Sequence, residues 1–469
     1  MIVNKDRILG IQMSPISMLH EGSDYVYKLL SQEAGLNSVF IYCSTYQICN
    51  WNRNKKNQLS TDHGVAPPDF DYSDTRNTWF EPNPKYYKNS RYFRSEDDGR
   101  IFADRDVFQE ALDNSEKYGF RVFARALEAE HGHLVIPGWQ QISTIDCYGK
   151  PTYRPCPNNP DYQIFWMSVM EDLFKSYPQL SGMKMGSERP GPLSLALFRG
   201  PYWYPQLLPD CFCKHCQARL REKGINPERS MEGFRKIVEY AEGLHSGSIT
   251  RGDGVLVGAL RIIGKYPEVI AHNREFLSGI DEFHAKLSGV IHTIKPEALF
   301  GLHIYQGATS WDFIHRATID YKEMANYVDF LKPVIYESIA GPRMATFINS
   351  IKTGIFSDFD DSFILQMLYQ IQGFTGPSFD KLSDDGFGYD YVYSETKRCV
   401  DALAGRALTL AGPGFDIGQP SEMDNPERVE LMIKACFDAG ADGLIVSREY
   451  DEMQRKNLQA VGRAIGKYS

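Results

Sequence analysis

The chain has 469 residues, of which 42% are hydrophobic and 24% charged, and this composition is typical of a globular protein with a large core. The formal net charge is −9 and no patch rich in Lys and Arg occurs, so we expect no nucleic-acid partner. No apolar run approaches the ~18 residues of a membrane span, and the N-terminal segment lacks the pattern of a signal peptide, so we expect no membrane partner.

Eight short apolar runs rich in β-forming residues follow one another along the chain, separated mostly by helical patterns. They are residues 8–14, 38–44, 120–126, 180–186, 299–305, 331–337, 408–414 and 442–448. Near-continuous apolar strands that alternate with helices indicate a parallel sheet covered by helices. Eight such strands predict an α/β fold, the (β/α)8 TIM barrel. A doubly wound sheet is the alternative, but the G-x-G-x-x-G fingerprint is absent after the first run.

Helical periodicity is clear between several of these runs. Residues 161–177 and 276–291 each carry an apolar face that we interpret as core. A third helix is predicted to begin at Pro426, with Asn425 as its N-cap, and to end at Gly440.

Two connections are much longer than the rest. Residues 45–105 follow the second predicted strand, and residues 191–297 follow the fourth. Long loops at the C-terminal face of a barrel are where substrate pockets are built. We therefore expect residues 1–469 to form a single (β/α)8 barrel domain that carries these two segments as insertions.

Polar side chains gather where the predicted strands end. In a barrel, residues at the C-terminal strand ends point into the mouth, where substrates bind. Strand four ends at Glu188 and strand six at Glu337, and these are the candidate catalytic residues. The candidate substrate-binding residues are Arg125, Arg189, His303, Trp311, Tyr336, Arg343, Asp416, Arg448, Glu449 and Tyr450. The segment after strand three adds Glu128, Glu130 and His131.

Neither a Ser nucleophile elbow nor a phosphate-binding Gly-rich loop occurs, so the strand ends point to paired-carboxylate chemistry. In glycoside hydrolysis one carboxyl group donates a proton to the leaving oxygen, and a second, ionised one acts as nucleophile or as base for water. Glu188 fits the first role and Glu337 the second, with Glu449 and Asp416 as alternatives for the second. The competing interpretation of each residue is a structural ion pair with a nearby Arg.

Aromatic residues make up 13% of the chain, and aromatic faces commonly pack on sugar rings. Trp51, Trp79 and Trp311 are the candidate sugar platforms. Core packing is the alternative for each of them, because large aromatic side chains also build ordinary cores.

Nine cysteines are spread without a disulfide-like framework, which favours a reducing compartment. We expect a cytoplasmic protein, or a periplasmic one if a leader has been removed. Three of the cysteines, Cys211, Cys213 and Cys216, form the pattern C-x-C-x-x-C, which suits a structural zinc. Cys156 is the preferred fourth ligand and Cys147 the alternative. Reduced cysteines beneath a helix, without metal, are the competing interpretation.

Two segments resemble a known family. "DCFCKHCQARLREKGI" resembles the Cys-rich segment after the fourth strand of glycoside hydrolase family 42 β-galactosidases, whose cysteines hold a structural zinc. "GADGLIVSREYDEMQRKNLQAVGRAI" looks like the last strand and helix of glycoside-hydrolase-like barrels. The resemblance implies that Glu188 is the acid/base. The chain departs from the family where Ser187 replaces an Asn before that Glu, and where Glu337 follows strand six instead of strand seven.

These observations predict a glycoside hydrolase that acts on a small glycoside or oligosaccharide. Its partner would be a carbohydrate substrate, catalysis would need no cofactor, and a homo-oligomer is left open. One alternative is a sugar lyase or isomerase, with His303, Glu337 and Glu188 as ligands of a divalent metal. The other is a barrel that binds glycans without catalysis.

Overall fold

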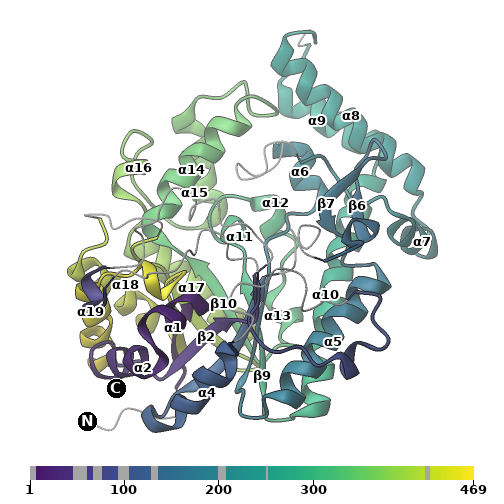
Figure 1. Cartoon of the computed structure of the whole chain (residues 1–469). Coiled ribbons are helices and arrows are strands. Elements are labelled where there is room, and N and C mark those ends of the chain that lie inside the picture. Colours follow the sequence, from purple (N-terminus) through teal and green to yellow (C-terminus); the bar gives the residue numbers. More distant parts are fainter. Residues whose placement is uncertain are drawn as a thin grey trace.

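The computed structural model describes residues 7–45, 61–66, 77–92, 105–127, 136–198, 207–249, 252–417 and 423–468. Its centre is a closed barrel of parallel strands in the order β1-β12-β11-β10-β9-β8-β5-β2, surrounded by helices (Figure 1). The strands are β1 (Leu9–Met13), β2 (Ser38–Tyr42), β5 (Arg121–Leu127), β8 (Gly182–Ser187), β9 (Leu299–Ile304), β10 (Phe330–Ile335), β11 (Leu408–Pro413) and β12 (Gly443–Val446).

The predicted (β/α)8 barrel is confirmed. Each of the eight apolar runs overlaps one barrel strand, and chain order gives the order around the barrel. The first and last strands close the barrel, since Leu9 pairs with Leu444 and Ile11 with Val446. The strand count is therefore right, and Glu337 does follow the sixth strand.

Helices cover the outside of the barrel. They include α2 (Ser23–Gln32), α4 (Val107–Tyr118), α5 (Pro160–Ser176), α10 (Glu268–Ile294), α17 (Tyr389–Leu403), α18 (Pro426–Asp438) and α19 (Arg455–Gly466). The predicted N-cap of α18 is confirmed, because the Asn425 side chain accepts a hydrogen bond from the Arg428 backbone N–H at 3.0 Å. Among the helices of the described segments, none is long and apolar enough to cross a membrane.

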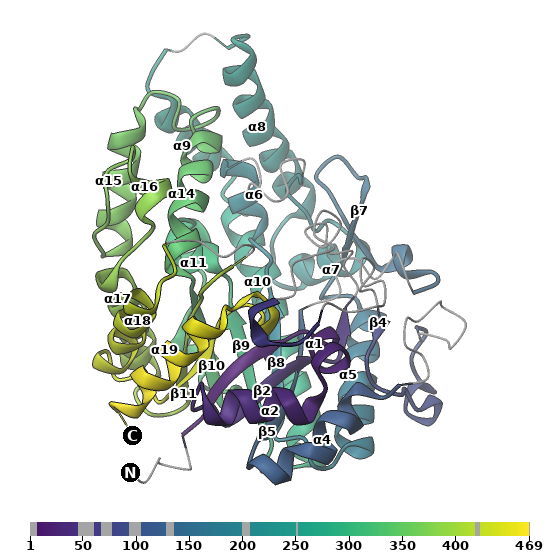
Figure 2. The same ribbon diagram turned by 60° about the vertical axis from the view of Figure 1, so that its left-hand side comes forward.

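The connections at the C-terminal ends of the strands are elaborate, as predicted after strands two and four. Between β2 and α4 lie β3 (Ser44–Thr45), η1 (Thr61–His63), β4 (Asn77–Thr78) and η2 (Pro84–Tyr87). Between β8 and α10 lie α6 (Pro192–Phe198), α7 (Lys214–Glu222), α8 (Pro227–Ser246) and α9 (Val255–Lys265). Figure 2 shows that α6, α8 and α9 rise above the strands.

Further short elements complete these connections. After β5 come η4 (Trp139–Ile142), β6 (Ser143–Ile145) and β7 (Pro151–Pro155). After β9 come α11 (Gln306–Ser310), α12 (Phe313–Arg316) and α13 (Tyr321–Met324). After β10 come α14 (Glu337–Ile351), α15 (Asp361–Gln372) and α16 (Leu382–Asp385). Helix α1 (Pro15–Glu21) follows β1, and η5 (Tyr450–Glu452) follows β12.

The lower half of the barrel interior is an apolar plug. Its buried residues are Ile8, Phe40, Phe123, Phe330, Leu410 and Ile445. The rings of Phe40 and Phe123 are stacked with centroids 4.5 Å apart. Gly301 leaves room for this plug, because a Cβ there would lie 2.2 Å from the Phe330 ring.

Polar side chains occupy the next layer toward the mouth. Side chains two residues apart on a strand face the same way. Arg125 therefore follows Phe123 into the interior, Lys332 follows Phe330, and on the other strands Gln12, Lys184 and His303 follow glycines. All five are buried, at 8% exposure or less.

The plug gives a direct test of the interior packing. Phe330→Ala removes a fully buried ring from the plug, and we expect the free energy of unfolding to fall by about 3–5 kcal/mol. Urea unfolding followed by circular dichroism measures this change. Phe363→Ala is the matched control, because Phe363 is 51% exposed and its removal should cost less than about 1 kcal/mol. Equal losses in the two variants would contradict the plug.

Candidate active site

Glu188 lies at the mouth of the barrel, directly after β8. Its side chain is 38% exposed, whereas the neighbouring His303 side chain on β9 is 7% exposed. The Nε2 atom of His303 lies 3.3 Å from Glu188 Oε1. The structure thus brings together two of the predicted site residues, an accessible carboxylate and an imidazole.

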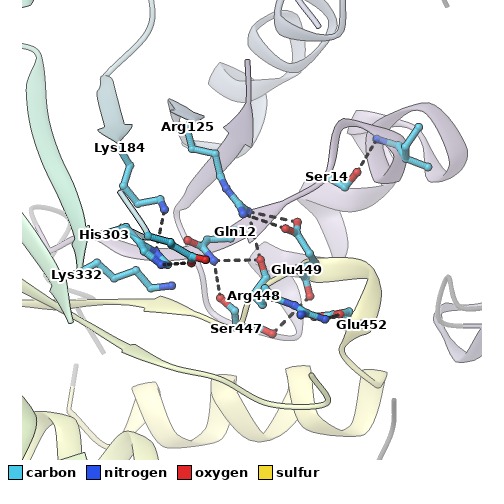
Figure 3. Close-up of polar contacts among 12 residues, drawn as sticks. Gln12, Ser14, Arg125, Lys184, His303, Lys332, Ser447, Arg448, Glu449 and Glu452 are labelled. Carbon is cyan, nitrogen blue, oxygen red and sulfur yellow. Dashed lines mark hydrogen bonds and ion pairs between the residues drawn. The ribbon is translucent and has the colours of Figure 1, made fainter. Parts of the chain in front are cut away.

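Lys184 extends this contact into the barrel. It lies on β8, four residues before Glu188, and is fully buried. Its Nζ atom lies 3.4 Å from the second ring nitrogen of His303, Nδ1 (Figure 3). His303 therefore lies between a buried amine and an exposed carboxylate.

Arg125 and Glu449 form a buried ion pair across the mouth. Arg125 Nη2 donates to Glu449 Oε1 at 2.9 Å, and Nη1 donates to Oε2 at 3.3 Å (Figure 3). The guanidinium also lies over the Tyr42 ring, 3.6 Å from its centroid. Burial raises the pKa of the Glu449 carboxyl, and the Arg125 charge partly offsets this rise. Two predicted residues from strands three and eight are thus paired.

Gln12 ties the first strand to the last. Its Nε2 atom donates to the carbonyl oxygens of Ser447 and Arg448, each at 3.0 Å. Ser447 has a left-handed backbone, with φ 57°, a conformation that non-glycine residues rarely adopt. Arg448 in turn pairs with Glu452 through a two-pronged contact. These contacts fix the turn after β12 that carries Glu449.

Lys332 is the second buried amine of the interior. Its Nζ atom donates to the Tyr336 hydroxyl at 3.1 Å, and a Cβ at Gly412 would lie 2.4 Å from its Cε. Burial and the nearby Arg125 lower the pKa of Lys332 well below its ordinary value. Burial also lowers the pKa of Lys184 and of His303, and the surrounding cations add to both shifts. The interior therefore disfavours further positive charge.

Sequence reasoning missed three interior residues, namely Gln12, Lys184 and Lys332. A signal was present, because Lys184 stands in "GMKMG" and Lys332 in "LKPVI", each within a strand otherwise apolar on both sides. A lysine is almost never fully buried without a partner or a function. A lysine inside an apolar strand run therefore indicates a candidate functional residue, as a carboxylate at a strand end does.

Arg189 and Arg343 border the mouth from two sides. Arg189 is buried, and its Nη1 atom donates to the Pro155 carbonyl at 2.6 Å. Arg343 on α14 contacts the Gln306 side-chain oxygen. Gln306 in turn donates to the backbone carbonyl of Tyr336 at 3.1 Å. Arg189 is thus held by the end of β7 and Arg343 by the start of α11.

The Glu337 carboxyl is buried against α18, whereas the Glu188 side chain is exposed at the mouth. Glu337 is the first residue of α14 and is fully buried. Its Oε1 atom is 4.0 Å from Arg428 Nε on α18. Burial raises the pKa of this carboxyl to about 8, and the nearby Asp424 adds to the rise. At neutral pH the group is therefore mostly protonated.

Three other predicted residues are engaged in buried contacts. Asp416 accepts hydrogen bonds from the backbone and side chain of Gln454 and from the Asn457 side chain, at 2.8–2.9 Å. The Tyr450 hydroxyl donates to Glu21 Oε2 at 2.5 Å. Trp311 is 1% exposed and packs near the Phe347 ring.

The remaining predicted aromatic and acidic residues fall into two groups. Trp79 is 2% exposed, and its ring nitrogen donates to Thr45 Oγ1 at 2.9 Å, so its ring faces the core. Trp51, Glu128, Glu130 and His131 lie outside the described residues.

The predicted cysteine cluster assembles at one place. The sulfurs of Cys156, Cys211, Cys213 and Cys216 all lie within 4.8 Å of one another. Cys156 Sγ is 3.5 Å from Cys216 Sγ and 3.6 Å from Cys213 Sγ. A tetrahedral zinc with Zn–S bonds of about 2.3 Å places its sulfurs about 3.8 Å apart, so the four thiols fit zinc. Burial raises the pKa of Cys211, whereas the surrounding thiols lower that of Cys213.

The cluster lies next to the mouth. Cys156 follows β7, and its neighbour Pro155 accepts the hydrogen bond from Arg189. A buried ion pair of 2.9 Å between Arg154 and Asp210 joins the same two segments. The cluster therefore links the connection after strand three to the insertion after strand four, beside Glu188.

Comparison with known proteins gives matches of structure. No protein-family model matches the chain, and no curated protein does. The glycoside hydrolase domain of PgaB (BpsB) from Bordetella bronchiseptica has a TM-score of 0.50 at 11% identity, covering 98% of this chain and 99% of that chain. The β-galactosidase from Halorubrum lacusprofundi has a TM-score of 0.51 at 11% identity, and the one from Marinomonas ef1 has a TM-score of 0.50 at 10% identity. Both matches cover 98% of this chain, but they cover only 58% and 59% of the respective β-galactosidase chains.

These matches define the class of the fold. At such low identity they show a common architecture, the TIM barrel, and no more; the matched proteins themselves are a glycoside hydrolase domain and two β-galactosidases. The relation to family 42 in particular stays a prediction, because it rests on the cysteine-rich segment alone.

Glu337 gives a pH-dependent test of its environment. Its carboxyl has an ordinary pKa of 4.5 and a folded pKa of about 8, so the wild type loses stability as the pH rises between these values. Glu337→Gln removes this loss. The variant's free energy of unfolding relative to the wild type should therefore increase from pH 5 to pH 8 in urea titrations.

The control is Glu297→Gln, because the Glu297 side chain is 74% exposed and stays in water when folded. This variant should show no such trend. A difference between Glu337→Gln and wild type that stays constant with pH would contradict the buried, protonated carboxyl.

Proposed function

We propose that the chain is a glycoside hydrolase acting on a small glycoside or oligosaccharide, with Glu188 as general acid/base. The observation that carries this proposal is the position of Glu188, a 38% exposed carboxylate at the end of the fourth strand, in contact with His303. A general acid must reach the leaving oxygen and must hold a proton near neutral pH. The exposed Glu188 carboxyl group meets the first requirement, and its contact with His303 offers a route by which a proton can reach it.

For the second carboxylate we propose Glu449 in preference to Glu337. Glu449 and Glu188 both act electrostatically on Lys184 and Lys332, so both border the same interior. Glu449 is oriented by two nitrogens of Arg125, whose charge favours the ionised carboxylate against the rise in pKa that burial causes. Glu337 instead is fully buried and lies near Arg428 of α18.

We also propose that the four cysteines bind one structural zinc. The sulfur spacing supports this, and so does the donor set, because four thiolates form a closed site with no position for substrate. The metal would supply no chemistry to the reaction. Its role would be to hold the Pro155 carbonyl where Arg189 is anchored.

A sugar lyase or isomerase is the second candidate. The buried amine of Lys184 favours it, since a neutral amine can accept a proton from carbon. The metal-dependent form has less support, because within the described segments His303 and Glu188 do not belong to a group of three or more metal-ligating side chains. A lyase would give an unsaturated product that absorbs ultraviolet light, which a hydrolase does not.

The hydrolase proposal is tested with Glu188→Gln on a panel of nitrophenyl glycosides and unactivated glycosides. A poor leaving group needs the proton that Glu188 donates, so we expect its hydrolysis to fall by at least ~100-fold. Activated aryl glycosides should keep partial activity. Initial rates of product release measure both.

Glu337→Gln is the matched control and should leave both rates near those of the wild type, whereas Glu449→Gln should abolish both. Full activity of Glu188→Gln on both substrate types would refute the proposal. If the wild type and every variant bind glycans tightly but show no turnover, the chain is the non-catalytic barrel instead.

The zinc proposal is tested by metal analysis of the purified chain and of Cys211→Ser. We expect one zinc per chain in the wild type and none in the variant, with the melting temperature lowered by about 5 °C. Cys399→Ser is the control, because Cys399 is buried on α17, outside the cluster. This variant should bind zinc as the wild type does. A wild-type chain without metal, unaltered by added zinc, would overturn the proposal.

A further inference from the structure

Lys184 is a buried, ionisable side chain that the proposed hydrolysis leaves without a role. It is fully enclosed in the barrel, and no ion pair joins its amine to a carboxylate among the residues that the structure describes. Its Nζ atom lies 3.4 Å from His303 Nδ1, and His303 Nε2 lies 3.3 Å from Glu188 Oε1. Figure 3 shows Lys184 and His303 side by side. A continuous chain of polar atoms therefore runs from the interior to the exposed carboxylate.

The protonation state of Glu188 fixes the direction of the hydrogen bonds along this chain. An ionised carboxylate only accepts, so His303 must carry its proton on Nε2 and must accept from Lys184 at Nδ1. A protonated carboxyl donates to Nε2 instead. The ring proton is then on Nδ1, and Lys184 must accept it as a neutral amine. When Lys184 is an ammonium ion in the first arrangement and a neutral amine in the second, the two arrangements hold the same number of protons.

We propose that Lys184 stores a proton for Glu188 and exchanges it through His303; this rests on the proposed function of Glu188 as general acid/base. The Lys184 ammonium releases a proton to Nδ1 of His303, while the Nε2 proton of His303 moves to Oε1 of Glu188. Two N–H bonds break, one N–H and one O–H bond form, and the three groups together gain and lose no proton. Lys184 is thus a positioning residue that acts through His303.

The surroundings of Lys184 favour this exchange. Burial, with Arg125 and Lys332 nearby, lowers the pKa of its ammonium well below the ordinary value, so the group can release a proton. The same surroundings lower the pKa of His303, so the ring stays neutral and can relay. Moving the proton to Glu188 removes the ammonium charge from the buried interior.

Charged and titratable groups from several elements act on the chain. They are Arg125 on β5, Lys332 and Tyr336 at β10, and Glu449 after β12. Glu449 favours the charged form of Lys184, but it is already paired with Arg125. The cations therefore outweigh it.

Lys332 provides a matched control. It is as deeply buried as Lys184, and it is the register partner of His303 on the neighbouring strand. Its amine contacts the Tyr336 hydroxyl and not the imidazole. Lys332→Met therefore removes a buried amine and one of the cations that lower the Lys184 pKa, while leaving the contacts of the proposed chain in place.

The test is the tautomer of His303 in the full chain labelled with ¹⁵N-histidine. Two-bond ¹H–¹⁵N spectra of the imidazoles distinguish Nδ1–H from Nε2–H, and the variant His303→Asn assigns the signal among the 11 histidines. We compare the wild type with Lys184→Met, Lys184→Arg and Lys332→Met near neutral pH. Arg keeps a positively charged N–H donor at this position, but it does not release a proton.

We expect both ring nitrogens of His303 to be partly protonated in the wild type and in Lys332→Met. In Lys184→Arg and Lys184→Met we expect Nε2–H alone. The same tautomer populations in the wild type and Lys184→Arg would overturn the proposal. So would a change in Lys332→Met as large as that in Lys184→Met.

An activity measurement separates this proposal from the proposed function. With unactivated glycosides, Lys184→Arg should lower kcat by about tenfold with KM unchanged, and Lys332→Met should have less effect. If Glu188→Gln keeps full activity while the Lys184 variants alter the His303 tautomer, the proton chain stands and the hydrolase proposal fails. Unaltered tautomers together with inactive Glu188→Gln would leave Glu188 as the acid and remove Lys184 from the mechanism.

Discussion

A closed barrel sends every second side chain of its strands into one enclosed space, and the rest of this structure depends on that constraint. The lower part of the space is filled by apolar side chains, so the polar layer above has no water beneath it. Each polar group there must be satisfied by another. The Arg125–Glu449 pair is the central case, since it joins strand three to the turn after strand eight. Gln12 anchors the same turn from strand one.

The fold could be predicted from the sequence because this constraint leaves a pattern. A barrel strand is covered on both sides, so it reads as an apolar run, and each predicted run lies within two residues of its strand. The position of Glu188 at a strand end could be predicted for the same reason. The contact between Glu188 and His303 follows from adjacent strands ending at the same level.

The direction of side chains could not be predicted in the same way. Because both sides of such a strand are apolar, the sequence does not reveal that Lys184 faces inward and Met185 outward. At the strand ends the backbone turns, and side chains no longer alternate between the inside and the outside of the barrel. Glu337 begins a helix there, so its carboxyl points toward α18. Trp311 follows a short helix that returns its ring to the core.

Charge balance inside the barrel connects these features to chemistry. Arg125 is paired with Glu449 and Arg448 with Glu452, which leaves Lys184 and Lys332 without an ion pair among the described residues. A buried lysine without an ion-pair partner is destabilised in its charged, ammonium form. The interior therefore favours the neutral amine form of both lysines. Of the carboxylates that act on both lysines, Glu188 is the one with an exposed side chain, at 38% against 5% for Glu449. Under the proposed function, desolvation that disfavours charge in the barrel would thus place a proton where a substrate oxygen can accept it.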